Sequence, residues 1–145
     1  MQEIESLMML NLYKFRKLNE RKLENVMKKY DLRKIDMDII ICLATYKDMR
    51  TAKDIASLEM FTKGHISQSI KRLKERGYII VSQDENDMRM QNLEVSENAK
   101  SIIHEVCAIK DALEKSVFDG ITEEEIETMK EVFRKICTNI NGIVG

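Results

Sequence analysis

One segment in the middle of the chain carries side chains suited to reading a nucleic acid. If residues 62–76 form a helix, a rotation of roughly 100° per residue places Ile66, Ile70 and Leu73 on one face. The opposite face then collects small, polar and basic residues: Lys63, Gly64, His65, Ser67, Gln68, Lys71 and Arg72. Hydroxyl and amide groups suit base edges, cations reach phosphates, and a glycine in the first turn lets backbone N–H groups approach a phosphate closely. Such a face is also typical of an ordinary solvated helix, so its context must decide.

Enzyme and metal chemistry have no comparable set of residues. The sequence offers no nucleophile with its base, no carboxylate pair in a cleft and no phosphate loop. The two histidines, His65 and His104, are distant in sequence, and Cys42, Cys107 and Cys137 lack the paired spacing of a disulfide framework or a metal site. We therefore expect no catalytic residue, no metal and no cofactor, and we expect the three thiols to be buried among their apolar neighbours.

The candidate reading helix is expected to lie among other short helices, because capping residues recur before it. Asp36 is expected to cap one helix, and Thr51 a second, with Asp54 in the capping-box position. Thr62 is expected to cap the reading helix itself, and Gly77 stands in the position just past its end. These residues predict three consecutive helices between residues 36 and 76.

A hairpin is predicted directly after these helices. Residues 78–81 are rich in β-forming side chains, residues 84–87 form a polar turn, and residues 90–95 can return as the second strand. Three helices followed by a two-stranded ribbon is the order of a winged helix-turn-helix, whose last helix before the ribbon enters the major groove of DNA. We expect a mostly α (α+β) fold with this unit at residues 35–99.

The flanks, residues 1–34 and 100–145, are predicted to be long helices. Ser96 is expected to cap a helix that stops at Gly120, and Thr122 with Glu125 forms a capping box for the last one. Near the N-terminus the apolar positions cover almost the whole circumference of the helix: Ile4, Leu7, Met8, Met9, Leu10, Leu12 and Tyr13. A helix that is apolar all round must be buried on several sides, so a second subunit is the expected cover.

Length and charge limit the remaining options. The 145 residues are sufficient for about one domain, so residues 1–145 are expected to form a single one. With 24 Lys and Arg against 25 Asp and Glu, the net charge is −1, and any contact with DNA must be a local patch. No stretch approaches the roughly 18 to 20 apolar residues of a membrane span, so we expect a cytoplasmic protein without a membrane partner.

The segment from about residue 36 to residue 100 resembles the MarR family of bacterial transcription regulators. Residues 51–56 resemble the first helix of the family's DNA-binding motif, and residues 62–77 align without gaps to its recognition helix. Asp87-Met88-Arg89, followed after five residues by Val95-Ser96, matches the family's D-x-R wing. The resemblance departs at Met60, where the family often has a glycine, and at Met88, where a second arginine is common.

The resemblance implies that double-stranded DNA is the partner. Arg89 is then expected to enter the minor groove while Asp87 holds it in place, and Thr51 and Lys53 are expected to position phosphates. A narrow minor groove concentrates negative potential and attracts an inserted guanidinium, so the physics agrees. The alternative interpretation keeps the winged helix as a protein-interaction module without DNA binding.

The resemblance also implies a homodimer modulated by a small effector. The expected interface residues are Leu7, Leu10, Ile126, Val132, Phe133, Ile136 and Ile140. A family crevice for small lipophilic or aromatic anions would be lined here by Tyr13, Phe15, Arg16 and Tyr46, although plain core and surface roles are the favoured interpretation of these four. The expected function is a transcriptional regulator, a repressor that binds a pseudo-palindromic operator.

Overall fold

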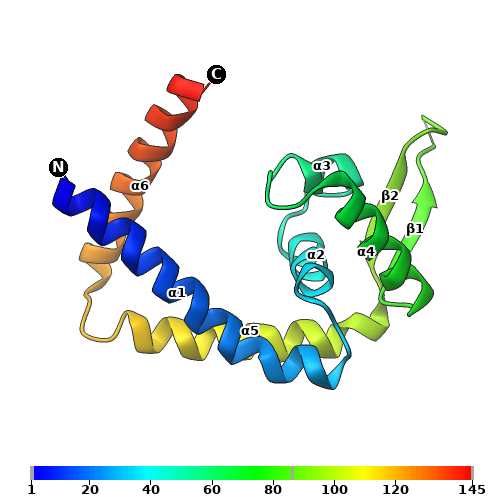
Figure 1. Ribbon diagram of the computed structural model, residues 1–145, viewed down its shortest axis with the longest axis horizontal. Helices are drawn as coiled ribbons and strands as arrows, with labels where there is room; N and C mark the ends of the chain where they lie inside the picture. The colour runs from blue at the N-terminus through cyan, green and yellow to red at the C-terminus, as the bar shows by residue number, and fades with distance from the viewer. Residues whose placement is uncertain (1, 86, 145) are drawn as a thin grey trace. The chain divides into compact units, whose positions relative to one another are not determined.

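The computed structural model describes residues 2–85 and 87–144 (Figure 1). In chain order the elements are α1 (Gln2–Lys29), α2 (Lys34–Thr45), α3 (Ala52–Ala56), α4 (Lys63–Glu75), β1 (Ile79–Gln83), β2 (Gln91–Val95), the 3-10 turn η1 (Glu97–Ala99), α5 (Lys100–Val117) and α6 (Glu123–Val144). They divide into two compact units, Met1–Lys110 and Asp111–Gly145. The side chains of residues 2–5, 8 and 9 are not described, so the expectations for Ile4, Met8 and Met9 lie outside the described residues.

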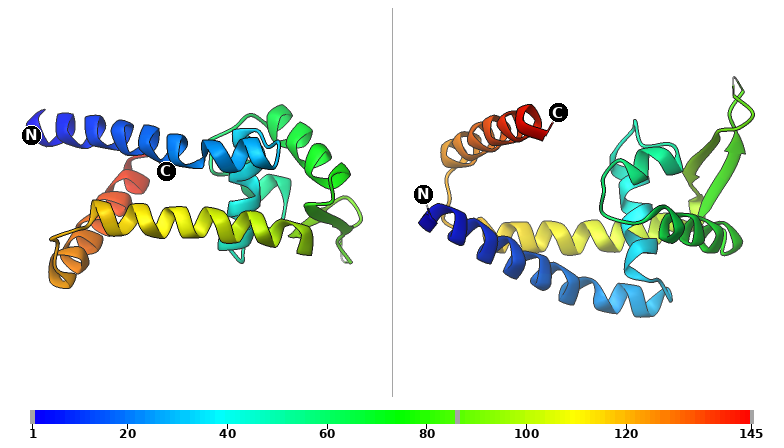
Figure 2. Two further views of the ribbon diagram at one scale, coloured as in Figure 1. Left: turned by 90° about the horizontal axis from the view of Figure 1, so that it is seen from below. Right: turned by 45° about the horizontal axis from the view of Figure 1, so that its top comes forward.

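The fold class is the predicted one, a mostly helical winged helix-turn-helix. Helices α2, α3 and α4 precede the antiparallel pair β1 and β2, in which Ile79 faces Val95 and Gln83 faces Gln91. Helix α4 packs against α2, α3 and β1 in the first unit, and the hairpin extends beside it (Figure 2). The order of helices and strands therefore places the candidate reading helix next to the wing.

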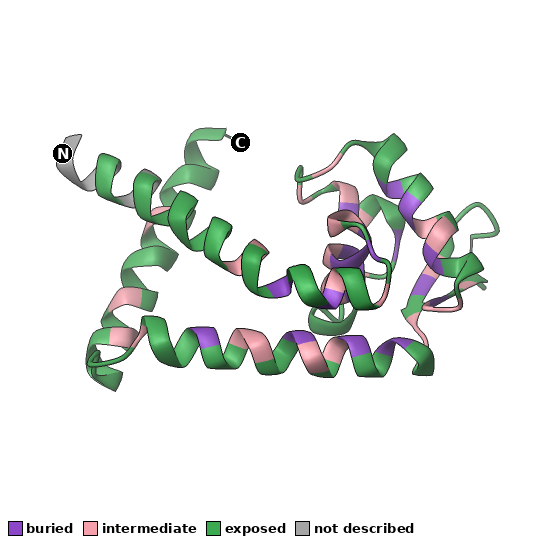
Figure 3. Ribbon diagram, turned by 60° about the horizontal axis from the view of Figure 1, so that its bottom comes forward, coloured by how far each residue is buried: buried purple, intermediate pink, exposed green. Residues whose placement is uncertain are grey.

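The first unit buries a continuous apolar core. Ile39 and Ile40 of α2, Leu73 of α4 and Ile102 and Val106 of α5 are completely buried in it. Buried positions recur at helical spacing along α4 and along the part of α5 that belongs to this unit (Figure 3). Because α4 contributes both Ile66 and Leu73 to this core, its opposite face is directed to solvent.

Local hydrogen bonds set several helix boundaries as predicted. The hydroxyl of Thr51 accepts the N–H of Asp54 at 3.1 Å, and that of Thr62 accepts the N–H of His65 at 3.3 Å. The Thr122 backbone N–H donates to the Glu125 carboxylate at 2.9 Å, which completes the capping box that begins α6. Gly77 has a φ of 72°, which glycine adopts without steric cost just past the end of α4.

Two predicted caps are wrong. Helix α2 begins earlier than expected, with Arg33 as its N-cap, and Asp36 is the third residue of the helix, where its carboxylate accepts the Arg33 N–H at 2.9 Å. The hydroxyl of Ser96 does not cap η1, because it donates to the carbonyl of Gly77 at 2.5 Å. In both cases the side chain binds a partner distant in sequence: Asp36 binds Ser69 and Arg72 of α4, and Ser96 binds Gly77 just past the end of α4.

The turn between α3 and α4 is made without a glycine. Glu59, directly before Met60, occupies the left-handed region with a φ of 55°. A non-glycine residue there costs about 1 to 3 kcal/mol, so the turn is held by its surroundings. It is bounded by hydrogen bonds from the Ser57 N–H to Lys53 and from the Glu59 N–H to Ala56.

The expectation of three buried thiols holds for none of them completely. Cys42 is half-buried, and burial raises the pKa of its thiol. Cys107 and Cys137 are exposed in this single chain, because each lies on the outward side of its helix. Within the described residues, no helix combines the length and the apolar character that crossing a membrane requires.

Candidate nucleic-acid interface

Helix α4 presents the predicted polar face to solvent. Six of the seven residues expected on this face are exposed, and Arg72 is not. The six are Lys63, Gly64, His65, Ser67, Gln68 and Lys71. A β-carbon placed on Gly64 would meet nothing within 4 Å, so the backbone of the first turn stands open to an approaching phosphate. This face combines amide and hydroxyl groups with two lysines, which suits base edges and phosphates respectively.

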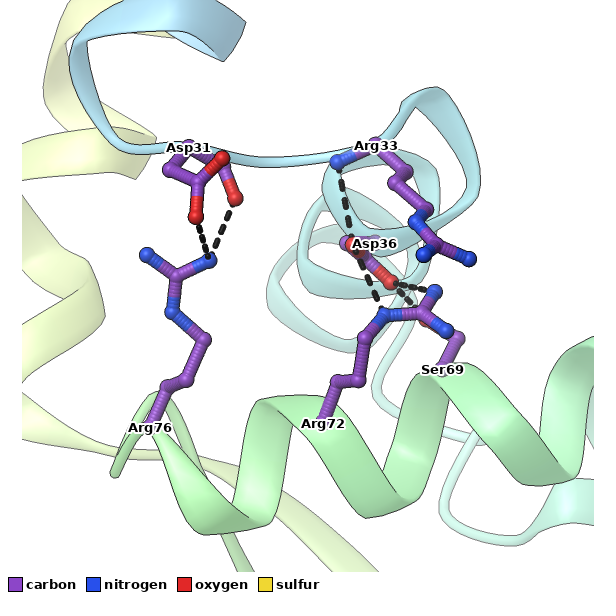
Figure 4. Close-up of polar contacts among 6 residues, drawn as sticks. All are labelled: Asp31, Arg33, Asp36, Ser69, Arg72 and Arg76. Atoms are coloured by element: carbon purple, nitrogen blue, oxygen red, sulfur yellow. Dashed lines mark hydrogen bonds and ion pairs between the residues drawn. The ribbon is translucent and has the colours of Figure 1, made fainter.

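Arg72 is the exception, and its predicted outward direction is wrong. Its side chain is 26% exposed and turns back to Asp36 of α2, with Nη2 2.6 Å from Oδ1 and Nε 3.4 Å from Oδ2 (Figure 4). The hydroxyl of the completely buried Ser69 donates to the same carboxylate at 2.5 Å. Burial raises the pKa of Asp36, but the hydrogen bonds from Arg72, Ser69 and the Arg33 N–H outweigh it and hold that pKa below its ordinary value.

Arg76 makes a second polar tie one helical turn further on. Its Nη1 donates to the carbonyl of Asp31 and lies 3.3 Å from Asp31 Oδ2 (Figure 4). Its Nη2 donates to the carbonyl of Tyr30 at 2.8 Å. Sequence reasoning missed both this tie and the role of Asp36. The available signal was Asp36, one of two acids in the largely apolar α2, together with Ser69, Arg72 and Arg76 at spacings of three and four residues along and just past α4.

The wing turn is organised by its acidic residues. The carboxylate of Asp84 accepts the Asp87 N–H at 3.1 Å and the Asn92 amide at 3.1 Å, and the Asp84 N–H donates to the Met90 carbonyl at 3.0 Å. Asp87 in turn accepts the backbone N–H of Arg89 at 2.9 Å. The predicted tie between Asp87 and Arg89 is therefore made through the backbone, and the Arg89 side chain is exposed at the tip. The expectation for Asn86 in this turn lies outside the described residues.

The two residues predicted to position phosphates differ in the structure. Thr51 is buried and its hydroxyl both donates to the Asp54 carboxylate at 2.8 Å and accepts the Asp54 N–H, so the expected role for Thr51 is wrong. The hydrogen bond from Thr51 also lowers the pKa of Asp54. Lys53 is exposed on α3 and stays a prediction.

Comparison with known proteins identifies this arrangement. Residues 36–90 match the model of the MarR family, and they contain most of α2, all of α3, α4 and β1, and the turn of the wing. Over these residues the chain is similar to the MarR family. An HTH-type transcriptional regulator of Bacillus cereus is 26% identical over 134 residues, which cover 92% of this chain and 88% of that protein. A regulator of the same description from Bacillus anthracis matches with the same identity and coverage.

Solved structures confirm the MarR fold over nearly the whole chain. The transcriptional regulator PA3341 matches with a TM-score of 0.81 and 19% identity, covering 96% of this chain and 98% of that one. MarR itself matches with a TM-score of 0.69 and 20% identity, covering 91% and 89%. A DNA complex of Staphylococcus aureus MepR matches with a TM-score of 0.60 and 22% identity, covering 88% and 98%. The relatives that match this chain are described as HTH-type transcriptional regulators, and PA3341 is described as a transcriptional regulator.

Among the residues that the structure describes, the four residues expected to bind an effector line different hollows or are exposed. Arg16 lines a pocket of about 480 Å³ in the first unit, together with residues of α2 and of the turn before α4. Tyr13 lines a separate hollow on α1, while Phe15 and Tyr46 are exposed and line neither. The grouping of these four residues in a crevice of the dimer stays a prediction, and in one chain Tyr13 and Arg16 line different hollows.

The pocket that contains Arg16 has its cations already paired. Glu20 accepts hydrogen bonds from Lys34 Nζ at 2.5 Å and from Arg16 Nε at 3.2 Å, and these contacts lower the pKa of Glu20 to about 2. Oδ2 of Asp38 and Oδ1 of Asn19 are buried there without a hydrogen-bond partner among the described residues, and burial raises the pKa of Asp38. The pocket therefore offers acceptors as well as cations.

The residues expected in the dimer interface lie on uncovered apolar faces. Leu7 and Leu10 are exposed on α1, and on α6 the residues Val132, Phe133 and Ile140 are exposed while Ile126 and Ile136 are half-buried. Helix α6 contains no buried residue, although its apolar residues form one stripe at helical spacing. Across residues 2–85 and 87–144, no group of three or more His, Cys, Asp and Glu side chains is arranged to hold a metal ion.

Proposed function

We propose that two copies of this chain form a homodimer that places its two α4 helices in successive major grooves of a pseudo-palindromic operator. The observation that carries this proposal is the exposed polar face of α4 beside an organised wing whose arginine, Arg89, is exposed at the tip. Two-fold symmetric proteins bind half-sites one helical turn apart, about 34 to 36 Å. Bound in this way, the dimer would exclude polymerase and repress transcription.

Base readout is assigned to Ser67 and Gln68, and phosphate contact to Lys63, Lys71 and Lys53. Gln68 and Ser67 lie on the exposed face of α4, where an amide and a hydroxyl can hydrogen-bond base edges. The lysines supply charge for phosphates and carry no sequence information. Arg89 at the wing tip is assigned to the minor groove, where a guanidinium meets the most negative potential.

The experiment that tests this proposal is selection of bound sequences from random DNA by the full chain. We expect an enriched inverted repeat whose half-sites are separated by one helical turn. The matched variant Gln68→Ala should lose the preference at one position of each half-site, while Lys71→Ala should weaken binding to all sequences alike. Enrichment of a single unrepeated site would contradict the dimer, and no enrichment would contradict operator binding.

Effector modulation is the second part of the proposal, with a small lipophilic or aromatic anion as the effector. Arg16 and Lys34 supply the cations nearest to the pocket on α1 and α2, and a ligand bound there would shift the population between states that fit and do not fit the operator. We expect benzoate, used as a probe, to release the operator in a gel-shift titration. Arg16→Ala should abolish this response, and release that is unchanged in Arg16→Ala would contradict the site.

A further inference from the structure

A buried carboxylate connects α2 to the back of α4. Asp36 is 2% exposed, and its two oxygens accept hydrogen bonds from Ser69 Oγ, Arg72 Nη2, Arg72 Nε and the Arg33 N–H (Figure 4). A buried charge is stable only when it is paired and hydrogen-bonded, and this one has both kinds of partner. Asp36, Ser69 and Arg72, which we call the Asp36 clamp, therefore form one unit, since removing any member leaves the others with an unmet polar group.

The Asp36 clamp supplies a directional contact that the apolar core does not. Ile66, Ile70 and Leu73 hold α4 against the core, but burial of apolar surface is non-directional and tolerates small rotations of a helix about its axis. A guanidinium and a carboxylate with parallel hydrogen bonds have a fixed relative geometry. The clamp contacts α4 beside its apolar stripe, so it selects one rotation among those that the core would accept.

The rotation of α4 decides what its exposed face presents. Gln68 directly precedes Ser69, and Lys71 directly precedes Arg72, so the clamp and the reading face share the same turns of helix. A helix with its side chains has a radius of about 5 to 6 Å, so a rotation of about 30° moves a side-chain tip by about 3 Å. Hydrogen bonds to base edges tolerate displacements of only a few tenths of an ångström, and a rotation of this size would break them.

We propose that Asp36, Ser69 and Arg72 are positioning residues that fix the rotation of α4 and so set the sequence discrimination of the regulator. Arg72 then acts through Asp36 and not by contact with a phosphate. This inference rests on the proposed reading of DNA by α4. It adds three residues that lie behind the DNA-facing surface to the set that determines specificity.

The decisive variant replaces the clamp by apolar groups of similar size, Asp36→Leu/Ser69→Ala/Arg72→Met. Apolar replacement of a buried ion pair commonly preserves or raises stability, so the melting temperature should stay at or above that of the parent chain. We expect operator affinity to fall about tenfold, while affinity for unrelated DNA is unchanged, so the ratio of the two affinities falls by the same factor. The matched control Arg21→Met, at an exposed position of α1, should leave this ratio unchanged. A triple variant that folds and keeps the parent ratio overturns the proposal.

Single substitutions keep the proposal testable if the triple variant does not fold. Asp36→Asn frees the Arg72 guanidinium, so a phosphate-binding Arg72 predicts equal or tighter operator binding, whereas positioning predicts weaker binding. For Arg72→Met, positioning predicts an unchanged dependence of affinity on salt, while a lost phosphate contact predicts that the log-log slope decreases in magnitude by about one. Equal or tighter binding by Asp36→Asn, or a reduced slope for Arg72→Met, overturns the proposal.

A measurement without DNA separates this inference from the proposed function. In the free parent protein and in Asp36→Asn, hydrogen exchange of the α4 amides reports how firmly the helix is held. We expect faster exchange in α4 of the variant, with unchanged exchange in α6. If the parent chain binds no DNA, the proposed function fails, but the exchange rates still show whether the Asp36 clamp holds α4. Unchanged exchange in α4 of Asp36→Asn overturns the clamp itself.

Discussion

The winged-helix segment, residues 34–95, and helix α6 differ in where their apolar side chains go. In the winged-helix segment Ile39, Ile40 and Leu73 are 0% exposed. In α6 the apolar residues Val132, Phe133 and Ile140 are 48%, 44% and 52% exposed in the chain as described. Both regions have clear amphipathic periodicity, so the periodicity alone does not say whether a face is covered from within the chain.

The single chain therefore covers the apolar core of the winged-helix segment, but it leaves the apolar stripe of α6 uncovered. Helix α4 is held by residues of its own chain, including α1 from Leu23 onward and α5 as far as Val106. Helix α6 contains no buried residue, and the described side chains of α1 up to Leu18 are exposed. Apolar stripes left uncovered over this length are characteristic of surfaces that bind a partner. In our proposal the partner is a second copy, which makes stability of the winged helix and stability of the dimer separable quantities.

The largest effect is expected in the completed core. Leu73→Ala removes a fully buried side chain from α4, and such truncations lower the free energy of unfolding by about 2 to 5 kcal/mol. Urea unfolding followed by circular dichroism measures it. Met88→Ala, at an exposed position of the wing, is the control and should change the free energy by less than about 0.5 kcal/mol. A loss below about 1 kcal/mol for Leu73→Ala would mean that α4 depends on something other than this core.

Deletion of residues 1–14 is expected to have a smaller effect on free energy, but it should dissociate the proposed dimer. The deletion removes Leu7 and Leu10 and leaves the core, which begins at Leu23. We expect the dissociation constant of the dimer to rise at least about 100-fold, equivalent to roughly 2.7 kcal/mol, with the helical signal of the winged helix retained. Sedimentation velocity measures the species present, and a stable dimer of the shortened chain would remove α1 from the interface.

The third expected effect is on operator binding and leaves the stability of both regions unchanged. Arg89→Ala removes an exposed guanidinium from a wing turn whose backbone is held by Asp84 and Asp87. We expect operator binding to weaken more than tenfold, about 1.4 kcal/mol or more, while dimer and melting temperature are unchanged. A gel-shift titration measures the operator affinity of Arg89→Ala, with Met88→Ala as the control variant. Unchanged affinity of Arg89→Ala would falsify the wing assignment.

The smallest expected effect is a difference between the winged-helix segment and α6 in how stability depends on pH. The pKa of Asp36 is held below its ordinary value of 3.8 in the folded chain, so its ionised form stabilises the fold above that pH. This contribution is lost as the pH falls through the folded pKa, so the stability difference between the parent and Asp36→Asn should shrink below about pH 3.8. Glu125, whose pKa is lowered by the Thr122 backbone at the exposed start of α6, is the comparison. Acid titrations should show a smaller dependence for Glu125→Gln, and an equal dependence would remove the distinction between buried and exposed carboxylates.

Features with partners close in sequence could be predicted. The caps at Thr51, Thr62 and Thr122 bind an N–H three residues away, and Gly77 ends α4 through its own backbone conformation. The order of helices and strands followed from such signals and from periodicity, and with it the winged helix and the exposed face of α4. The D-x-R turn of the wing was likewise local, since Asp87 and Arg89 are two residues apart.

What the tertiary structure alone decided concerns side chains with more than one available partner. Arg72 lies at the margin of the polar face, and its long side chain can reach outward or back; the choice depends on Asp36, 36 residues earlier in the chain. Ser96 stands at the N-cap position of η1, but its hydroxyl donates to the carbonyl of Gly77, 19 residues away, instead of accepting a helix N–H. The residues that form α4 could be predicted from its own local signals. Packing of α2 against α4 determined which polar residues stay exposed on the proposed DNA-reading face and which contact Asp36, because a buried carboxylate must be hydrogen-bonded by the donors around it.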